Sequence, residues 1–231
     1  MKALIFDTET IDAYNRLDCF DIGWVIRDLK NNKIIKKRAY YPEEVLKNKK
    51  LFKLAYFYDK NYKFYETRVS TPFDEVRRKL NKDFIKYSPD IFSAYMIGFD
   101  TRVLNFNFLK YTSIGTKINM DKLGLRTSVI DLPLLFGVVE LKHSEAYKNY
   151  CADNNLLTKT LKSKTTVEAV YSYIKGEHIE EHHTGLQDAI MESEILQYCY
   201  DNSEDIEKDI KEAVNLTKQR KRIWFLKEMK L

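Results

Sequence analysis

Short apolar runs bounded by polar or turn-forming residues recur along the chain and predict buried strands. Two of them are separated only by Asn31-Asn32, and asparagine tolerates the positive φ of a hairpin turn, so we expect an antiparallel pair. The runs that predict strands are Ala3 to Phe6, Ile22 to Leu29, Lys33 to Tyr41, Ile91 to Tyr95 and Val129 to Asp131.

Apolar residues at a spacing of three or four predict helices after most of these strands. Thr71-Pro72 indicates one helix start, and Thr165-x-x-Glu168 and Thr184-x-x-Gln187 have the form of capping boxes. Residues 43–70, rich in Lys and Tyr, predict irregular structure or short helices. The predicted helices run from Thr71 to about Ser88, from Asp100 past Phe108, over 144–154 and 166–174, from Thr184 past Leu196, and from about Ser203 to Arg222.

Strands that alternate with helices are typical of an α/β fold. At 231 residues the chain suits a single core. We therefore expect one domain over residues 1–200, with 42–70 as an insertion or irregular segment, and a basic C-terminal helix over 201–231 that packs on the domain or extends it.

Composition narrows the class of protein. Hydrophobic residues make up 44% and charged residues 32%, which indicates a globular protein, and a net charge of +5 permits nucleic-acid binding without arguing for it. Three cysteines without a CxxC spacing suggest neither a disulfide framework nor a zinc site, so a reducing cytoplasm is expected. No apolar stretch is long enough to predict a membrane span.

Asp7 and Glu9 lie at i and i+2 at the end of the first strand, where the alternation of side chains points both to one face. Hydrolysis of a phosphodiester by two divalent ions needs several convergent carboxylates of this kind. Taken alone, Asp-x-Glu is equally compatible with a solvated strand end.

Together with two later motifs, this pair resembles the DEDDh exonucleases, a family of the RNase H-like superfamily that includes the proofreading subunit of DNA polymerase, RNase T and oligoribonuclease. The matching segments are Phe6-Asp7-Thr8-Glu9-Thr10, Asp21-Ile22-Gly23-Trp24-Val25, Ala94-Tyr95-Met96-Ile97-Gly98-Phe99-Asp100 and His183-Thr184-Gly185-Leu186-Gln187-Asp188-Ala189. They follow the family's order between residues 4 and 197. Segments 42–66 and Lys164–Tyr171 more weakly resemble exonucleases of tailed bacteriophages, which implies the host cytoplasm as the location.

The resemblance implies an RNase H-like fold, with a mixed central sheet and flanking helices, and a 3′→5′ exonuclease that releases 5′-mononucleotides. By the family's roles, Asp7 bridges two Mg²⁺ or Mn²⁺ ions, Glu9 and Asp188 complete the shell of the first, and Asp100 supports the second. His183 is then the general base.

The substrate contacts that the resemblance implies are Thr8, Thr10, Met96 and Phe99. Met96 stands where the family usually has asparagine. Because a thioether is a poor hydrogen-bonding substitute for an amide, substrate binding is expected to differ. Single-stranded DNA is the expected substrate, and a polymerase or replication protein is a candidate partner. RNA trimming by the same chemistry stays open, as does a silent binding module, although none of the acids is missing.

Several other residues could take part in function, but each also has an ordinary structural explanation. For Asp131 a surface turn is the expected reading, and the basic stretch 218–222 suits either phosphate binding or a solvated helix end. Trp224 and Phe225 suit docking on the domain or on a partner. Four tyrosines could stack on unpaired bases but more often pack half-buried: Tyr56, Tyr58, Tyr62 and Tyr65.

Overall fold

The computed structural model describes the backbone of residues 1–231 except 12–16, 56–63, 66, 113–126, 143 and 229–231, and it describes no side chain beyond Arg220. Tyr56, Tyr58, Tyr62 and the side chains of Trp224 and Phe225 therefore lie outside the described part of the chain. All statements below refer to the described residues.

A mixed sheet of six strands forms the centre, in the order β4-β3-β2-β1-β5-β6. β1 pairs antiparallel with β2, and β2 with β3, whereas β1, β5 and β6 run parallel to one another. Asn32 has φ 47° in the turn between β2 and β3, so the predicted hairpin is confirmed. The strands are β1 Lys2–Thr10, β2 Cys19–Asp28, β3 Lys33–Pro42, β4 Ser70–Thr71, β5 Ile91–Ala94 and β6 Ser128–Asp131.

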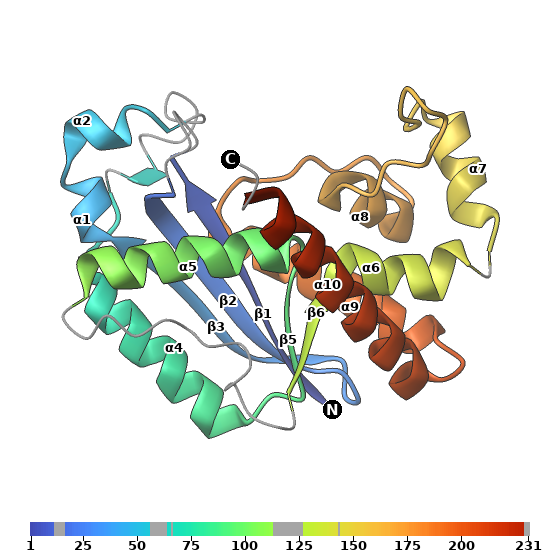
Figure 1. Ribbon diagram of the computed structural model, residues 1–231, viewed down its shortest axis with the longest axis horizontal. Coiled ribbons are helices and arrows are strands. Elements are labelled where there is room, and N and C mark those ends of the chain that lie inside the picture. Colours follow the sequence, from blue (N-terminus) through green and yellow to red (C-terminus); the bar gives the residue numbers. More distant parts are fainter. Residues whose placement is uncertain (12–16, 56–63, 66, 113–126, 143, 229–231) are drawn as a thin grey trace.

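Helices cover both faces of this sheet (Figure 1). The alternation of β1 divides its side chains between two cores: Ala3 and Ile5 face α6, α8 and α9, whereas Leu4 and Phe6 face α4 and α5. The helical elements are α1 Glu43–Leu46, α2 Lys49–Phe52, α4 Phe73–Tyr87, α5 Ile97–Tyr111, α6 Leu132–Phe136, the π-helical η3 Gly137–Leu141, α7 Ala146–Asp153, α8 Val167–Lys175, α9 Gly185–Asn202 and α10 Ile206–Glu228.

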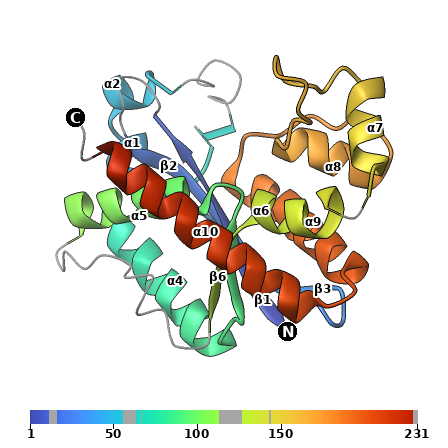
Figure 2. The ribbon, with the colours of Figure 1, turned by 45° about the vertical axis from the view of Figure 1, so that its right-hand side comes forward.

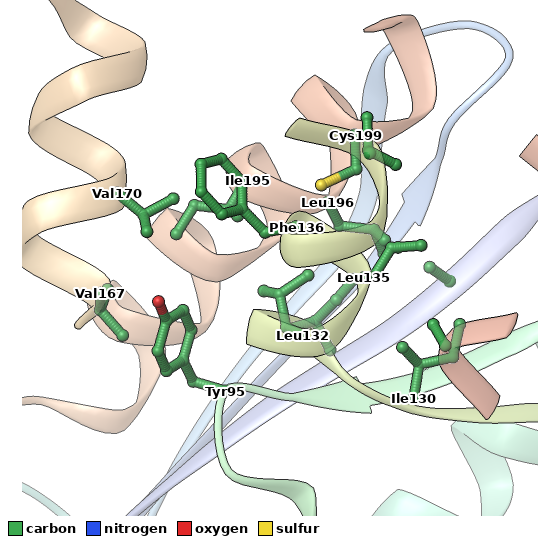
Figure 3. Close-up of a cluster of buried hydrophobic side chains, with 14 of the residues drawn as sticks. Tyr95, Ile130, Leu132, Leu135, Phe136, Val167, Val170, Ile195, Leu196 and Cys199 are labelled. Carbon is green, nitrogen blue, oxygen red and sulfur yellow. The ribbon is translucent and has the colours of Figure 1, made fainter. Parts of the chain in front are cut away.

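The larger core joins β5 and β6 to the helices that follow them. Figure 3 shows Phe136 of α6 against Ile195 and Leu196 of α9, with Tyr95 and Val167 at its edge. This packing fixes the start of α9 relative to the end of β5, which are the two places from which predicted site residues project.

Several predicted boundaries are wrong by a few residues. α5 begins at Ile97, so Asp100 lies in its first turn and does not open the helix. The capping residue of α8 is Thr166, whose Oγ1 accepts from the Ala169 amide at 3.3 Å, and not Thr165, whose carbonyl accepts the Tyr95 hydroxyl at 2.6 Å. Thr184 does precede α9, but its side chain makes no capping hydrogen bond.

Residues 43–70 contain the short helices α1 and α2, as predicted. Their apolar side chains form a third small core with Ile11 and Phe20, which places this insertion beside the end of β1. The three cysteines are free and buried, which agrees with the expected absence of disulfides. Within the described residues, no helix combines the length and apolarity needed to cross a bilayer.

Candidate active site

Asp7 lies near the end of β1, at the edge of the sheet where the parallel strands β5 and β6 also end. Its side chain is half-buried and points to the face covered by α9. Burial raises the pKa of Asp7 well above its ordinary value, and the negative charges of Glu192, Asp100, Glu9 and Asp188 raise it further. Asp7 is thus the centre of a group of converging carboxylates.

Asp100 reaches this centre from the opposite face of the sheet. It is 4% exposed in the first turn of α5, and its Oδ1 accepts a 2.7 Å hydrogen bond from the Thr8 hydroxyl. Burial raises the pKa of Asp100 to about 7, although the Thr8 hydrogen bond favours the charged form. Thr8 therefore fixes the orientation of this carboxylate.

Asp188 projects from the first turn of α9 and is 1% exposed. Among the described residues, neither of its carboxylate oxygens has a hydrogen-bond partner of ordinary geometry. Burial, followed by the charge of Glu181, raises the pKa of Asp188 to about 8. A buried carboxylate without donors is costly unless a cation or proton accompanies it, so this position suits a ligand of a metal ion.

Glu9 and His183 complete this side of the site. One ligand atom each from Glu9, His183 and Asp188 lie within 4.8 Å of one another, a separation that one cation could bridge. Burial, followed by the charge of Asp188, raises the pKa of Glu9. The structure therefore brings the five sequence-predicted residues together. Glu9, His183 and Asp188 form one group, and Asp7 is close enough to Glu9, Asp100 and Asp188 for their charges to raise its pKa.

His183 has φ 54°, a left-handed conformation that is uncommon for a residue with a side chain. The turn that follows lies so close to β2 that a Cβ on Gly23 would come within 2.1 Å of the Leu186 amide nitrogen. Glycine at 23 and at 185 is therefore required for the close approach.

Asp21 and Tyr65 hold the same turn from the side of the insertion. The Tyr65 hydroxyl donates to Asp21 Oδ2 at 2.9 Å and lies 3.5 Å from the His183 carbonyl oxygen. Burial raises the pKa of Asp21 to about 7, while the hydroxyl of Tyr65 and the amide of Gly185 favour its charged form. Tyr65 is 4% exposed, so it is a buried packing residue and not a stacking platform for bases.

Glu192, Glu181 and Glu168 surround the five predicted residues and were missed by the sequence reasoning. Glu192 is 1% exposed and accepts a hydrogen bond from the Tyr95 amide at 3.1 Å. Glu168 and Glu181 offer ligand atoms within 4.8 Å of His183 and of each other. Of the three, only Glu192 could have been found from the sequence. It lies four residues after Asp188 in α9, and residues four apart share one face of a helix.

A cavity of about 720 Å³ opens beside the carboxylates. Asp7, Thr8 and Asp100 lie on one side, and α6, η3, α8 and α10 supply the other. Met96 and Phe99, expected to contact substrate, line this cavity together with Thr8, whereas Thr10 is half-buried in β1 and is not among the lining residues. The volume is sufficient for a nucleotide-sized ligand.

Asp131 was expected in a surface turn, and this is wrong. It is 4% exposed at the end of β6, and its Oδ2 accepts a 2.7 Å bond from Arg220 Nη1. Its own amide donates to Thr217 Oγ1 at 3.0 Å. The α10 helix therefore attaches to β6 through a buried carboxylate, and part of the basic stretch 218–222 faces the cavity.

The residues fit a hard divalent cation. The donor set consists of carboxylate oxygens and one imidazole, which suit Mg²⁺ or Mn²⁺, and the carboxylate of Asp188 is buried without a donor among the described residues. Burial and, after it, the charges of neighbouring carboxylates raise the pKa values of Asp7, Glu9 and Asp188, and a bound cation would offset both effects.

The six-stranded mixed sheet with helices on both faces is an RNase H-like fold, and the carboxylates lie where the parallel strands end. The structure of cell-death related nuclease 4 (CRN-4) is similar, with TM-score 0.52 and 18% identity over 87% of this chain and 64% of that one. A structure of a full-length 3′-exonuclease aligns with TM-score 0.45 and 11% identity over 85% of this chain and 59% of that one, a likeness too distant for argument.

This chain therefore spans about 64% of the length of CRN-4. No family model matches the sequence, and comparison with curated proteins finds no match. The likeness to CRN-4 establishes the fold, and the chemistry must be argued from the site itself.

Proposed function

We propose that this protein is a metal-dependent 3′→5′ exonuclease that hydrolyses single-stranded DNA from its 3′ end and releases 5′-mononucleotides. The observation that carries the proposal is the convergence of Glu9, Asp100 and Asp188 around Asp7, with His183 beside Glu9 and Asp188. A nucleotide-sized cavity lined by Asp7 and Asp100 opens beside them. Asp7, Glu9 and Asp188 would hold one divalent ion, and Asp7 with Asp100 would hold the other.

When bound, such ions would lower the pKa of a water molecule and stabilise negative charge on the phosphate and the leaving oxygen. His183 takes a proton from the attacking water as its oxygen bonds to phosphorus. The bond from phosphorus to the 3′ oxygen breaks, and that oxygen takes up a proton from solvent. Thr8 keeps the Asp100 carboxylate in place through its 2.7 Å hydrogen bond.

DNA rather than RNA is our first choice of substrate, and the cytoplasm is the compartment that three reduced cysteines suit. Trimming of single-stranded ends and proofreading beside a polymerase both follow from the same activity. Oligomers of matched sequence in DNA and RNA distinguish the two substrate classes, because a site that requires the 2′-hydroxyl would favour the RNA.

Asp7→Ala tests the proposal directly. Removal of the central acid should abolish hydrolysis of a single-stranded oligomer with Mg²⁺, while circular dichroism should show an unchanged fold because like-charge repulsion is relieved. Asp90→Ala is a suitable control, since Asp90 is exposed at the start of β5, on the edge of the sheet away from the site. Digestion by Asp7→Ala at the wild-type rate would contradict the assignment of the site.

A further inference from the structure

The ion pair between Asp131 and Arg220 lies at the same edge of the sheet as Asp7. Ile5 is level with Ser93 of β5, and Ser93 is level with Ile130 of β6, so Asp131 is two strands away from the end of β1. Neighbouring strands are about 4.8 Å apart, which puts the backbone of Asp131 roughly 10 Å from the central strand. An arginine side chain anchored there is within reach of a ligand that extends out of the site.

The α10 helix presents one face to the cavity. Leu216 and Arg220, four residues apart, both line it, and Thr217 between them accepts the Asp131 amide hydrogen. Figure 2 shows α10 crossing in front of β6. The C-terminal helix is therefore part of the cavity wall.

Charge makes Arg220 notable in this cavity. The wall carries four acids, Asp7, Asp100, Glu181 and Glu192, and among the described residues its cations are Lys142 and Arg220. Lys142 forms an ion pair with Glu212 on α10. Arg220 uses Nη1 for Asp131, and its side chain remains 41% exposed, so a guanidinium with five N–H donors retains capacity for a further acceptor.

The proposed hydrolysis gives a direction to the bound strand. Glu9, His183 and Asp188 form one group of ligand atoms, whereas Asp100 lines the cavity that Arg220 also lines. In an in-line displacement the leaving oxygen departs opposite to the attacking water. The shortened strand, which carries that oxygen, therefore extends away from His183, through the cavity that Asp100 and Arg220 both line.

We propose that Arg220, anchored by Asp131, binds the phosphodiester of the strand on the 5′ side of the bond being cleaved. The inference rests on the proposed function and names its substrate class more closely: a polynucleotide with at least one phosphodiester beyond the scissile one. Arginine suits this task because its planar donors match two phosphate oxygens. A nucleotide ester without an upstream phosphate would not use this contact.

The experiment compares Arg220→Gln with the wild-type protein on two substrates, a single-stranded DNA oligomer and the p-nitrophenyl ester of thymidine 5′-monophosphate. For the oligomer we expect KM to rise roughly tenfold or more, the scale of a lost charge-assisted hydrogen bond, with kcat nearly unchanged. The slope of log KM against log salt should fall by about 0.7, the value for one phosphate contact on a single strand. Hydrolysis of the ester should be unchanged.

Two further variants control for charge and folding. Lys218→Gln removes the same charge from an exposed position on α10 that does not line the cavity, and it should leave the oligomer KM unchanged. Asp131→Asn combined with Arg220→Gln removes both charges, so no buried carboxylate is left unpaired, and it should reproduce the selective loss on the oligomer.

Equal losses of activity on the oligomer and the ester would overturn the inference. They would show that Arg220 stabilises the site as a whole and does not bind the upstream phosphodiester. An unchanged KM and salt slope would overturn it as well. A wild-type protein that hydrolyses neither substrate would instead overturn the proposed function, so the two failures are distinguishable.

Discussion

The Tyr65 hydroxyl donates to Asp21 at 2.9 Å and lies 3.5 Å from the carbonyl oxygen of His183, so it joins the second strand to the turn that carries the imidazole. Tyr65 belongs to the segment 42–70, which the sequence predicted to be an insertion or irregular segment. Through this contact the segment stabilises the site, because the left-handed conformation of His183 persists only when the surrounding residues hold it.

Tyr65→Phe should lower kcat by about two- to tenfold with little change in KM. A lost hydrogen bond of this kind is worth about 0.5–1.5 kcal/mol, and it would act on the proposed general base rather than on substrate binding. Steady-state kinetics on a single-stranded oligomer measures both constants. Tyr41→Phe is the matched control, because the Tyr41 ring packs 5.9 Å from the Tyr65 ring without taking part in this link. Equal effects of the two substitutions would contradict the link.

His183→Ala should lower the rate by roughly 10² to 10⁴, the scale for a positioned general base. His182 and His178 are exposed neighbours, so His182→Ala and His178→Ala should change it far less. Single-turnover rates with saturating enzyme separate this effect from product release. A severe loss in His178→Ala with normal turnover in His183→Ala would show that the third motif is placed on the wrong histidine.

The strands and the order of the site motifs could be predicted because they depend on local patterns. The continuous apolar run Ala3 to Phe6 identified β1, and Asp7 at its end indicated where the strand reaches a site. The pairs Tyr65–Asp21 and Asp131–Arg220 could not be predicted, since they join residues 44 and 89 positions apart by side-chain contact. The segment Leu132–Leu141 was missed as helix because it is apolar on nearly every side and so shows no clear period.

The stability of the EDTA-treated protein should fall as pH rises. Burial raises the pKa of Asp100 and Glu181 to about 7 and that of Asp188 to about 8, above the values near 4 expected in the unfolded chain. The folded protein then binds more protons than the unfolded chain between about pH 4 and pH 8, so the free energy of unfolding decreases across that window.

Mg²⁺ should reverse this loss, because it replaces the protons on the same carboxylates. We expect saturating Mg²⁺ to raise Tm by roughly 5 to 10 °C near pH 8 and by much less near pH 5, where protons compete with the ion. Thermal unfolding with Mg²⁺ and with EDTA at each pH gives the comparison. An equal shift at both pH values, or a full shift in Asp188→Asn, would show that the ion binds elsewhere.

The proposed exonuclease accepts one terminal nucleotide at a time. The cavity beside Asp7 and Asp100 has the volume for a nucleotide. A duplex must lose its last base pairs before an end can enter, at roughly one to two kcal/mol for each base-pair step. Single strands and mismatched 3′ ends should therefore be digested faster than blunt duplexes.

A ladder assay with the label at the 5′ end tests this on single-stranded, mismatched and fully paired DNA with Mg²⁺. The expected result is a labelled strand that shortens by one nucleotide at a time, fastest when the DNA is single-stranded. Each cycle leaves a new 3′ end for the same site. Immediate release of the labelled nucleotide would require attack from the 5′ end. Cleavage of a closed circular single strand would require a site open at both ends, and either result would contradict a site that holds one terminal nucleotide at a time.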